Sequence, residues 1–301
     1  MTKILRFGSA AAAAAGIILA TGAFALAPVA RTQAAAPSGA AAARTAGRTA
    51  QVVPGHPMIP LGAPGQRRAD GAGSGPAATV RSVNWSGYAA TRSGKSFSLV
   101  RATFFVPYLN CAVAADTYSA HWVGFDGFYG KPDSVEQDGI EADCVGTAGQ
   151  TARYRAWYEM FPNPETVGSI KVNSGDSITA SVSYSSATRK FRLTVTDNTN
   201  RRHFTVAKGC AAHITCPRTS AQVISEAPAN SQGQLLPMAD YGAVAFASIA
   251  ITGGAGQRGS LVSRRWRTTK IVQYGDVSRK RIAQPTAIHA DSFANYWLGP
   301  I

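Results

Sequence analysis

A glutamine and a glutamate stand out in this sequence because they belong to no conventional catalytic set. Gln137 follows a W-x-G-x-D-G turn at 122–127, and Glu226 lies in the short block SEAPA at 225–229. A carboxylate can take a proton from water as the water attacks a carbonyl, and can return that proton to a leaving amine. A carboxamide can orient the water through its oxygen and donate an N–H to the developing oxyanion. If the fold brings the two together, they could hydrolyse an amide bond without serine, cysteine or metal.

Other catalytic patterns do not occur in the chain. The sequence contains no G-x-S-x-G elbow and no H-E-x-x-H motif. The run RSGKS at 92–96 lacks the first glycine of a phosphate-binding loop, because residue 89 is alanine. His121, His203 and His213 are available for a serine triad, but no serine or cysteine near them has a motif context. We interpret these histidines as structural.

The elements that must position the two residues are strands. Period-two alternation dominates the chain after Arg81, and Gly, Asn, Asp and Pro punctuate it at short intervals. No stretch after that residue has a sustained helical period with caps. Many short strands with turn signals predict an all-β fold, an antiparallel sandwich or barrel. The predicted strands are 101–108, 151–161, 177–186, 189–198, 203–208, 221–227, 242–252 and a segment around 268–274.

The stretch 151–161 has two different faces. Alternation places apolar and aromatic residues on one face and polar residues with a tryptophan on the other: Tyr154, Ala156, Tyr158 and Met160 against Arg153, Arg155, Trp157 and Glu159. The first face suits packing against a core, and the second suits the wall of a cleft. The alternative is an ordinary solvated face with one partly buried tryptophan.

The first 81 residues do not have the composition of a folded domain. Lys3 and Arg6 precede an apolar stretch with small-residue cleavage sites after it, so we expect residues 1–36 to be a signal peptide. An uncleaved anchor is the alternative, because the stretch could just span a bilayer. Residues 37–81 contain no aromatic residue, which predicts a low-complexity linker, a tail or a propeptide. Processing sites in it would be Arg67-Arg68 and Arg81.

All ten tyrosines and all five tryptophans lie after Arg81, so we expect one domain at 82–301. This part has 22 basic and 15 acidic residues, and its net charge is therefore +7. Nine acids fall between Asp116 and Glu165, whereas the region after Arg258 is mostly basic. A basic surface could attract nucleic acid or an anionic cell wall. No nucleic-acid motif accompanies it, and we expect no nucleic-acid partner.

Four cysteines in an exported chain indicate two disulfides. Cys210 and Cys216 enclose a short loop and pair most naturally with each other. Cys111 would then pair with Cys144, across the segment that carries Gln137. Three connectivities are possible, and the sequence does not choose among them. Zinc is the competing use of cysteine, but no C-x-x-C occurs and the histidines are scattered, so we expect no metal site.

Five blocks in order along the chain resemble the glutamic peptidases, the G1 or eqolisin family of secreted endopeptidases. They are NWSGYAA at 84–90, HWVGFDG at 121–127, EQDG at 136–139, AWYEMFP at 156–162 and AQVISEAPA at 221–229. The resemblance covers most of the chain from 83 to 298. It implies an antiparallel β-sandwich of two large sheets, concanavalin-like or jelly-roll-like, with a substrate cleft on one sheet face.

The resemblance also implies residue roles. The family's catalytic glutamine and glutamate map onto Gln137 and Glu226. Its acidic cleft residues match Asp126 and Glu159, which would tune the site or contact substrate; their structural alternatives are a turn cap and an ion pair. Trp122 and Trp157 are candidate cleft aromatics, with core packing as the alternative for each. No metal and no organic cofactor are implied.

We therefore expect a secreted, extracellular endopeptidase that acts as a monomer on protein or peptide substrates, without membrane contact once its signal is removed. An acidic optimum is expected because a carboxylate base works best near its own pKa. One rival is a non-catalytic lectin-like or cell-wall-binding sandwich, since the same architecture serves carbohydrate modules. Another is a glycosidase with two carboxylates, Glu159 and Glu226.

Overall fold

The computed structural model describes residues 52–53, 59, 78–112, 116–128, 134–146 and 151–300. These ranges form strands and turns, and within them no helix has the length and apolar character needed to cross a membrane. The strands are β1 (Val52–Val53), β2 (Ala78–Ser82), β3 (Trp85–Thr91), β4 (Phe97–Phe105), β5 (Thr117–Asp126), β6 (Val135–Val145), β7 (Thr151–Phe161), β8 (Thr166–Val167), β9 (Ser177–Ser185), β10 (Lys190–Asp197), β11 (Arg202–Lys208), β12 (Ser220–Glu226), β13 (Ala229–Asn230), β14 (Ala243–Gly253), β15 (Arg258–Gly259), β16 (Arg267–Tyr274), β17 (Arg281–Pro285) and β18 (Phe293–Trp297).

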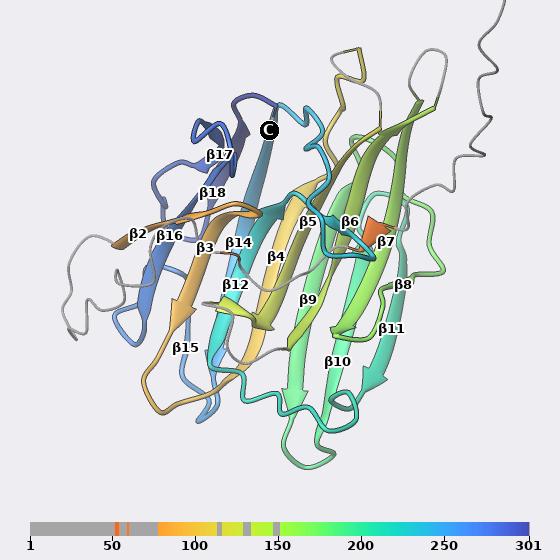
Figure 1. Ribbon diagram of the computed structural model, residues 1–301. Helices are drawn as coiled ribbons and strands as arrows, with labels where there is room; N and C mark the ends of the chain where they lie inside the picture. The colour runs from red at the N-terminus through yellow and green to blue at the C-terminus, as the bar shows by residue number, and fades with distance from the viewer. Residues whose placement is uncertain are drawn as a thin grey trace, which may run out of the picture. The chain divides into compact units, whose positions relative to one another are not determined.

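The strands form two stacked antiparallel sheets, and the fold is the expected all-β sandwich (Figure 1). The front sheet has the order β8-β7-β6-β5-β12-β3, and the back sheet has the order β11-β10-β9-β4-β14-β18-β17. Strand β16 belongs to both. Its residues 267–271 pair with β3, whereas Gln273 and Tyr274 pair with β17, so the chain passes from one layer to the other within a single strand. Strand β2 pairs with β16 in parallel.

The larger hydrophobic core fills the space between the sheets. Phe125 and Ile140 from the front sheet meet Phe104 and Phe191 from the back sheet, and all four side chains are buried. A smaller cluster covers the opposite face of the front sheet, around Trp85, Trp122 and Trp157. Because side chains alternate along a strand, the front sheet has apolar residues on both of its faces.

Several of the strands predicted from alternation are present, and burial on both faces explains why β5 and β6 were not predicted. The strands predicted at 151–161, 177–186, 189–198, 203–208 and 221–227 correspond to β7, β9, β10, β11 and β12, with small shifts at the ends. Strands β5 and β6 were not predicted from alternation. Nearly all of their residues are buried, so their sequences carry no polar-apolar period. In β7, the predicted core face is confirmed, because its four residues pack in or against the larger core.

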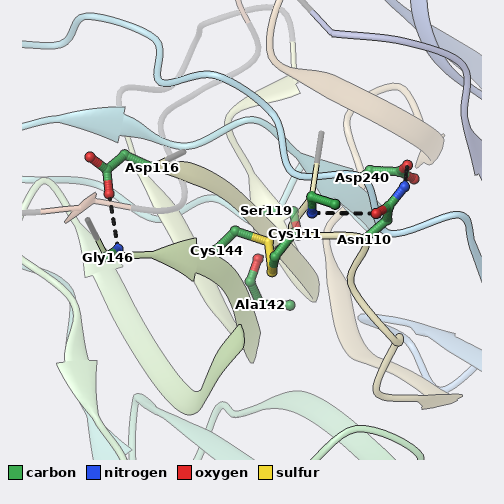
Figure 2. Close-up of a disulfide and its surroundings, with 9 residues drawn as sticks. Asn110, Cys111, Asp116, Ser119, Ala142, Cys144, Gly146 and Asp240 are labelled. Atoms are coloured by element: carbon green, nitrogen blue, oxygen red, sulfur yellow. Dashed lines mark hydrogen bonds between the residues drawn. A yellow bond between two sulfur atoms is a disulfide. The ribbon is translucent and has the colours of Figure 1, made fainter. Parts of the chain in front are cut away.

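Two disulfides close loops around the front sheet. Cys111, after β4, is bonded to Cys144 near the end of β6, with a Cα–Cα distance of 5.3 Å (Figure 2). Cys210 and Cys216 form the second bond, with a Cα–Cα distance of 6.0 Å. The first bond joins the strand that carries Gln137 to the loop leaving the back sheet. Figure 2 also shows the Asn110 amide donating a hydrogen bond to Asp240 next to this bridge.

The expected signal peptide at 1–36 and most of the segment 37–81 lie outside the described residues. The described part of that segment consists of Val52, Val53, Ile59 and the residues from Ala78 onwards. Strand β2 therefore begins before the expected domain start at 82.

Candidate active site

Gln137 and Glu226 lie on the same face of the front sheet, on strands separated only by β5. Across the β5–β6 ladder Gln137 faces Gly124, and across the β5–β12 ladder Glu226 faces Ala120. Gly124 and Ala120 are an even number of residues apart on one strand, so both side chains project from the same face. This face carries the smaller cluster around Trp122. Both catalytic candidates are fully buried.

N–H groups of Trp122 and Asn84 donate hydrogen bonds to the Glu226 carboxylate. Trp122 Nε1 donates to Glu226 Oε2 at 2.8 Å, and Asn84 Nδ2 donates to Oε1 at 3.3 Å. Asn84 precedes β3 and is itself tied to the end of β12, because its backbone oxygen accepts the Ala227 N–H at 2.9 Å. Hydrogen bonds from N–H groups favour the charged form of a carboxylate and fix its orientation. The cleft aromatic expected at Trp122 thus contacts the proposed general base directly.

Gln137 is held by Glu159, its direct partner across the β6–β7 ladder. Gln137 Nε2 donates to Glu159 Oε2 at 2.7 Å, which fixes the orientation of the carboxamide. Burial raises the pKa of Glu159 well above its usual range, and the negative charge of Glu226 raises it further. Gln137, Glu159 and Glu226 therefore share one electrostatic environment, although Gln137 and Glu226 face β5 residues four positions apart.

The glycines of the W-x-G-x-D-G turn and of EQDG give these side chains room. A Cβ on Gly124 would lie 2.9 Å from Gln137 Cβ and 2.9 Å from the Glu136 carbonyl oxygen. A Cβ on Gly139 would lie 2.7 Å from Trp122 Cα. Real Cβ atoms do not approach so closely, so both positions require glycine. The two glycines therefore allow β5 and β6 to pack closely at Trp122 and Gln137.

Asp126 ends β5 with a φ of +64° and is fully buried. Its carboxylate accepts hydrogen bonds from the backbone N–H groups of Arg218 at 2.6 Å and Thr219 at 2.7 Å, and from the Thr219 hydroxyl at 3.0 Å. Burial raises the pKa of Asp126, and these donors oppose the rise. The side chain fastens the chain just before β12, the strand that carries Glu226, which favours the turn-cap interpretation of this residue.

Three tryptophans belong to the smaller apolar cluster on the face of the front sheet that carries Gln137 and Glu226. Trp85 and Trp122 meet edge to face with ring centroids 5.0 Å apart, and Trp157 belongs to the same cluster. Trp157 is fully buried, and its Nε1 has no hydrogen-bond partner among the described residues. A buried donor without a partner is unusual in a folded protein. The structure therefore places Trp157 beside the candidate site with an N–H still to satisfy.

A second group of acids continues along the same face. Arg155 forms an ion pair with Glu141, and its Nη2 lies 3.7 Å from Asp143 and 3.9 Å from Glu165. Burial raises the pKa of Asp143 and of Glu165 to about 7, although Arg155 opposes the rise, and it raises the pKa of Glu141 well above its usual range. A single arginine, Arg155, therefore lies within 4.0 Å of three buried carboxyl groups and partly compensates their charge.

A histidine and a serine also lie within hydrogen-bond distance, but inside the fold. His121 Nδ1 is 2.9 Å from Ser225 Oγ, and both residues are fully buried. They project into the intersheet core, where the His121 ring packs on Tyr241 with centroids 4.9 Å apart. Burial lowers the pKa of His121 to about 3, which keeps the ring neutral. The burial of His121 and its contacts with Ser225 and Tyr241 favour the structural interpretation of this residue.

Sequence reasoning missed the contact that Asn84 makes with Glu226. It lies in the NWSGYAA block, yet nothing in its local sequence shows that it meets a glutamate 142 positions away. Metal-ligating patterns give no further candidate: the described residues contain no group of three or more His, Cys, Asp and Glu side chains placed to hold an ion.

Comparison with known proteins gives the fold and the family. The family model described as the Peptidase A4 family matches residues 83–285. Among solved structures, a scytalido-glutamic peptidase with a peptide-based transition-state analogue is 23% identical, with a TM-score of 0.60 over 72% of this chain and 98% of that one. SCP-B, a member of the eqolisin family in complex with the tripeptide Ala-Ile-His, is 22% identical, with a TM-score of 0.56 over the same shares.

Aspergilloglutamic peptidase from Aspergillus niger is 23% identical, with a TM-score of 0.52 over 60% of this chain and 99% of that one. No curated protein matches the chain. The structural likenesses show the shared sandwich, and the family model covers more than half of the chain. The chain therefore belongs to the Peptidase A4 family and is a hydrolase of the glutamic peptidase type.

Proposed function

We propose that this protein is an exported endopeptidase that hydrolyses peptide bonds at acidic pH, with Gln137 and Glu226 as its catalytic pair. One observation carries the assignment of residues: a carboxylate held by the Trp122 indole and a carboxamide held by Glu159 lie on one face of the front sheet, with only β5 between their strands. The family shows the reaction type, and this arrangement supports the choice of residues.

The chemistry follows from the donors and acceptors present. The Glu226 carboxylate takes a proton from a water molecule as the water attacks the peptide carbonyl, and then returns that proton to the leaving amine. Gln137 Nε2 carries two hydrogens, of which one is donated to Glu159; the other can meet the oxyanion, and the carboxamide oxygen can orient the water. Loss of one such oxyanion donor typically removes about 3 kcal/mol of transition-state stabilisation.

Acidic conditions suit this site because of its neighbours. Burial raises the pKa values of Glu159, Glu141, Asp143 and Glu165, so ionising all four beside Glu226 at neutral pH is unfavourable. At acidic pH they are protonated, and the local repulsion falls. Export is supported by the two disulfides, which persist in oxidising compartments. The proposed substrates are proteins or peptides.

The test is proteolysis of a denatured protein from pH 2 to 8, with serine, cysteine, metal and aspartic peptidase inhibitors present. We expect cleavage at acidic pH that none of these inhibitors abolishes, and its loss in both Glu226→Gln and Gln137→Ala with the fold retained by circular dichroism. Cleavage that persists in either variant contradicts the residue assignment. Sugar release that survives Gln137→Ala would instead favour a glycosidase using Glu159 and Glu226, and sugar binding without proteolysis a lectin-like module.

A further inference from the structure

The turn that connects β3 to β4 carries a basic residue at each of its ends. The Lys95 N–H donates to the Arg92 carbonyl oxygen at 3.3 Å, and Gly94 between them has a φ of +60°. A turn of this kind brings the Cα atoms of its first and last residues within about 7 Å of each other. The run RSGKS is followed by a strand, so it forms no phosphate-binding loop, but its turn still holds two positive charges close together.

The turn between β14 and β15 lies against this one at the same end of the sandwich (Figure 1). The Gly254 N–H donates to the Ser96 carbonyl oxygen at 2.7 Å, and Arg92 Nη1 donates to Gln257 Oε1 at 3.1 Å. The two turns are therefore fixed relative to each other by both backbone and side-chain contacts. They enclose a cavity of about 150 Å³, which is lined by Arg92, Lys95, Ser96, Gly254, Ala255 and Gln257.

The polar side chains that line the cavity can all donate hydrogen bonds, and no carboxylate is among them. Arginine and lysine carry several N–H donors and no acceptor. Because Arg92 donates to the Gln257 oxygen, the NH2 group of that amide is left for another partner. Every ion pair between described residues involves Arg155, so in this part of the chain no carboxylate neutralises Arg92 or Lys95.

We propose that this cavity is a binding site for a tetrahedral oxyanion, a phosphate or sulfate group. Arg92 and Lys95 supply positive charge, and the side chains of Ser96 and Gln257 supply further donors. The oxygens of such a group accept hydrogen bonds on every side, and charged donors bind them most strongly. A cavity of about 150 Å³ accepts a molecule the size of benzene, and a phosphate or sulfate group is smaller.

More arginines lie at this end of the sandwich, where they suit the further groups of a polymer. The Trp266 ring packs against Phe97 with centroids 5.8 Å apart, which holds the preceding Arg264 and Arg265 near the β3–β4 turn. Both arginines are exposed, as is Arg258 on β15. A polymer with repeated phosphate or sulfate groups contacts several of these side chains at once and binds more tightly than one free ion.

The cavity lies at the opposite end of β3 from the candidate active site. Trp85, the first residue of β3, faces Glu226 in the β3–β12 ladder, and Arg92 follows the last residue of the same strand. At about 3.3 Å per residue, the strand separates the two by about 20 Å. Occupation of the cavity is therefore independent of the proposed catalytic pair, and Lys95→Gln should hydrolyse a short peptide as fast as the parent.

The first experiment is a titration of the isotope-labelled full chain with sodium phosphate at pH 7, followed by NMR through the amide signals of Gly94 and Gly254. Sodium chloride keeps the ionic strength constant, so that general screening does not change. We expect saturable shifts with a dissociation constant on the order of millimolar. Lys95→Gln should weaken binding about threefold or more, because one exposed ion pair is lost, and Lys95→Arg should restore it.

Lys171→Gln is the matched control, because it removes the same charge from an exposed residue elsewhere. Lys171 precedes β9, whose first residue, Ser177, pairs with the end of β4 remote from Ser96. This variant should bind phosphate like the parent. Absence of saturable shifts overturns the proposal, and so does an equal loss of affinity in Lys95→Gln and Lys171→Gln, since net charge alone would then explain binding.

A second titration distinguishes a free ion from a polymer and uses soluble poly(glycerol phosphate). Binding at least about tenfold tighter per phosphate than that of inorganic phosphate, weakened by Arg264→Gln combined with Arg265→Gln, identifies a polymer as the ligand and supports the site. Equal affinity for the two probes, lowered in both by Lys95→Gln, supports the site with a free ion as its ligand. Polymer binding that Lys95→Gln leaves unchanged overturns the assignment of the cavity.

Discussion

Gln137 Nε2 donates a 2.7 Å hydrogen bond to Glu159 Oε2, and the two residues face each other directly across the β6–β7 ladder. The bond gives Glu159 a defined role on the proposed site: it sets which way the carboxamide of Gln137 points. Burial, followed by the negative charge of Glu226, raises the pKa of Glu159 well above its usual range, and the hydrogen bond from Gln137 opposes that rise.

Replacing Glu159 separates orientation from charge. Glu159→Leu removes the acceptor, so Gln137 loses its fixed orientation, and we expect kcat to fall about 10- to 100-fold with little change in KM. Glu159→Gln keeps an acceptor oxygen and should lose much less. Steady-state kinetics on one peptide substrate measure both. Equal losses in the two variants, with unchanged thermal stability, would contradict the orienting role.

Trp122→Phe tests the hydrogen bond that the Trp122 indole donates to Glu226. The substitution keeps most of the buried ring but removes the Nε1 donor, 2.8 Å from Oε2. Because a hydrogen bond to a charged group contributes about 1.5–3 kcal/mol, we expect kcat/KM to fall at least about tenfold. The acidic limb of its pH profile should also move to higher pH, since the carboxylate form loses a donor. An unshifted limb would mean that the indole only fills space.

Gly124→Ala tests whether the W-x-G-x-D-G glycine makes room for Gln137. The added Cβ would lie 2.9 Å from both Gln137 Cβ and the Glu136 carbonyl oxygen, so the strands must shift. We expect a loss of unfolding free energy of about 1–3 kcal/mol and a greater than tenfold loss of activity. Gly209→Ala is the control, because among the described residues a Cβ added there would have no atom within 4 Å other than those of its two chain neighbours. Similar activity in both variants would refute the explanation.

The acids around Arg155 make stability depend on pH. Asp143 and Glu165 have folded-state pKa values of about 7, above their ordinary values of 3.8 and 4.5, so the folded state binds more protons than the unfolded state. Their contribution is therefore fully present below about pH 4 and is lost as pH rises towards 7. Thermal unfolding midpoints should fall across this window. A midpoint that rises from pH 4 to pH 7 would contradict the assignment.

Arg155→Met tests how far the arginine offsets the charge of these acids at neutral pH. Without the arginine, the three carboxyl groups face one another alone, so the variant should lose about 2 kcal/mol of unfolding free energy at pH 7 and less than about 1 kcal/mol at pH 4. Arg192→Met on β10 is the control, because its side chain is exposed and should change little at either pH. Denaturant unfolding at the two pH values gives the comparison.

Strand β7 was predictable because one of its faces differs from the other. In β7, alternation assigned Tyr158 to the core and Glu159 to the other face, and the structure has both there. Strand β6 offered no such period, since Gln137 and its neighbours are buried on both sides. An alternation of polar and apolar residues appears only where one face of a strand is exposed to solvent. The strands at the centre of the front sheet are buried on both faces.

Residue chemistry and family resemblance predicted Gln137 and Glu226 as the candidate pair, but they did not predict the contacts of the residues that hold this part of the sheet. Asn84 meets Glu226 because the segment before β3 lies beside the end of β12, and sequence separation hides such contacts. The Asp126 carboxylate likewise accepts hydrogen bonds from Arg218 and Thr219, which lie 92 and 93 positions later in the chain. These are pairings between distant strands, which local propensity does not encode.

The position of β12 between β3 and β5 has a consequence for biosynthesis. Strands β3 and β5 both precede β12 in the chain, so neither can pair with it until the residues up to Glu226 have been synthesised. During translation the chain thus carries the amide of the pair without its acid. On the proposed assignment, a chain truncated before Ser220 would therefore lack peptidase activity.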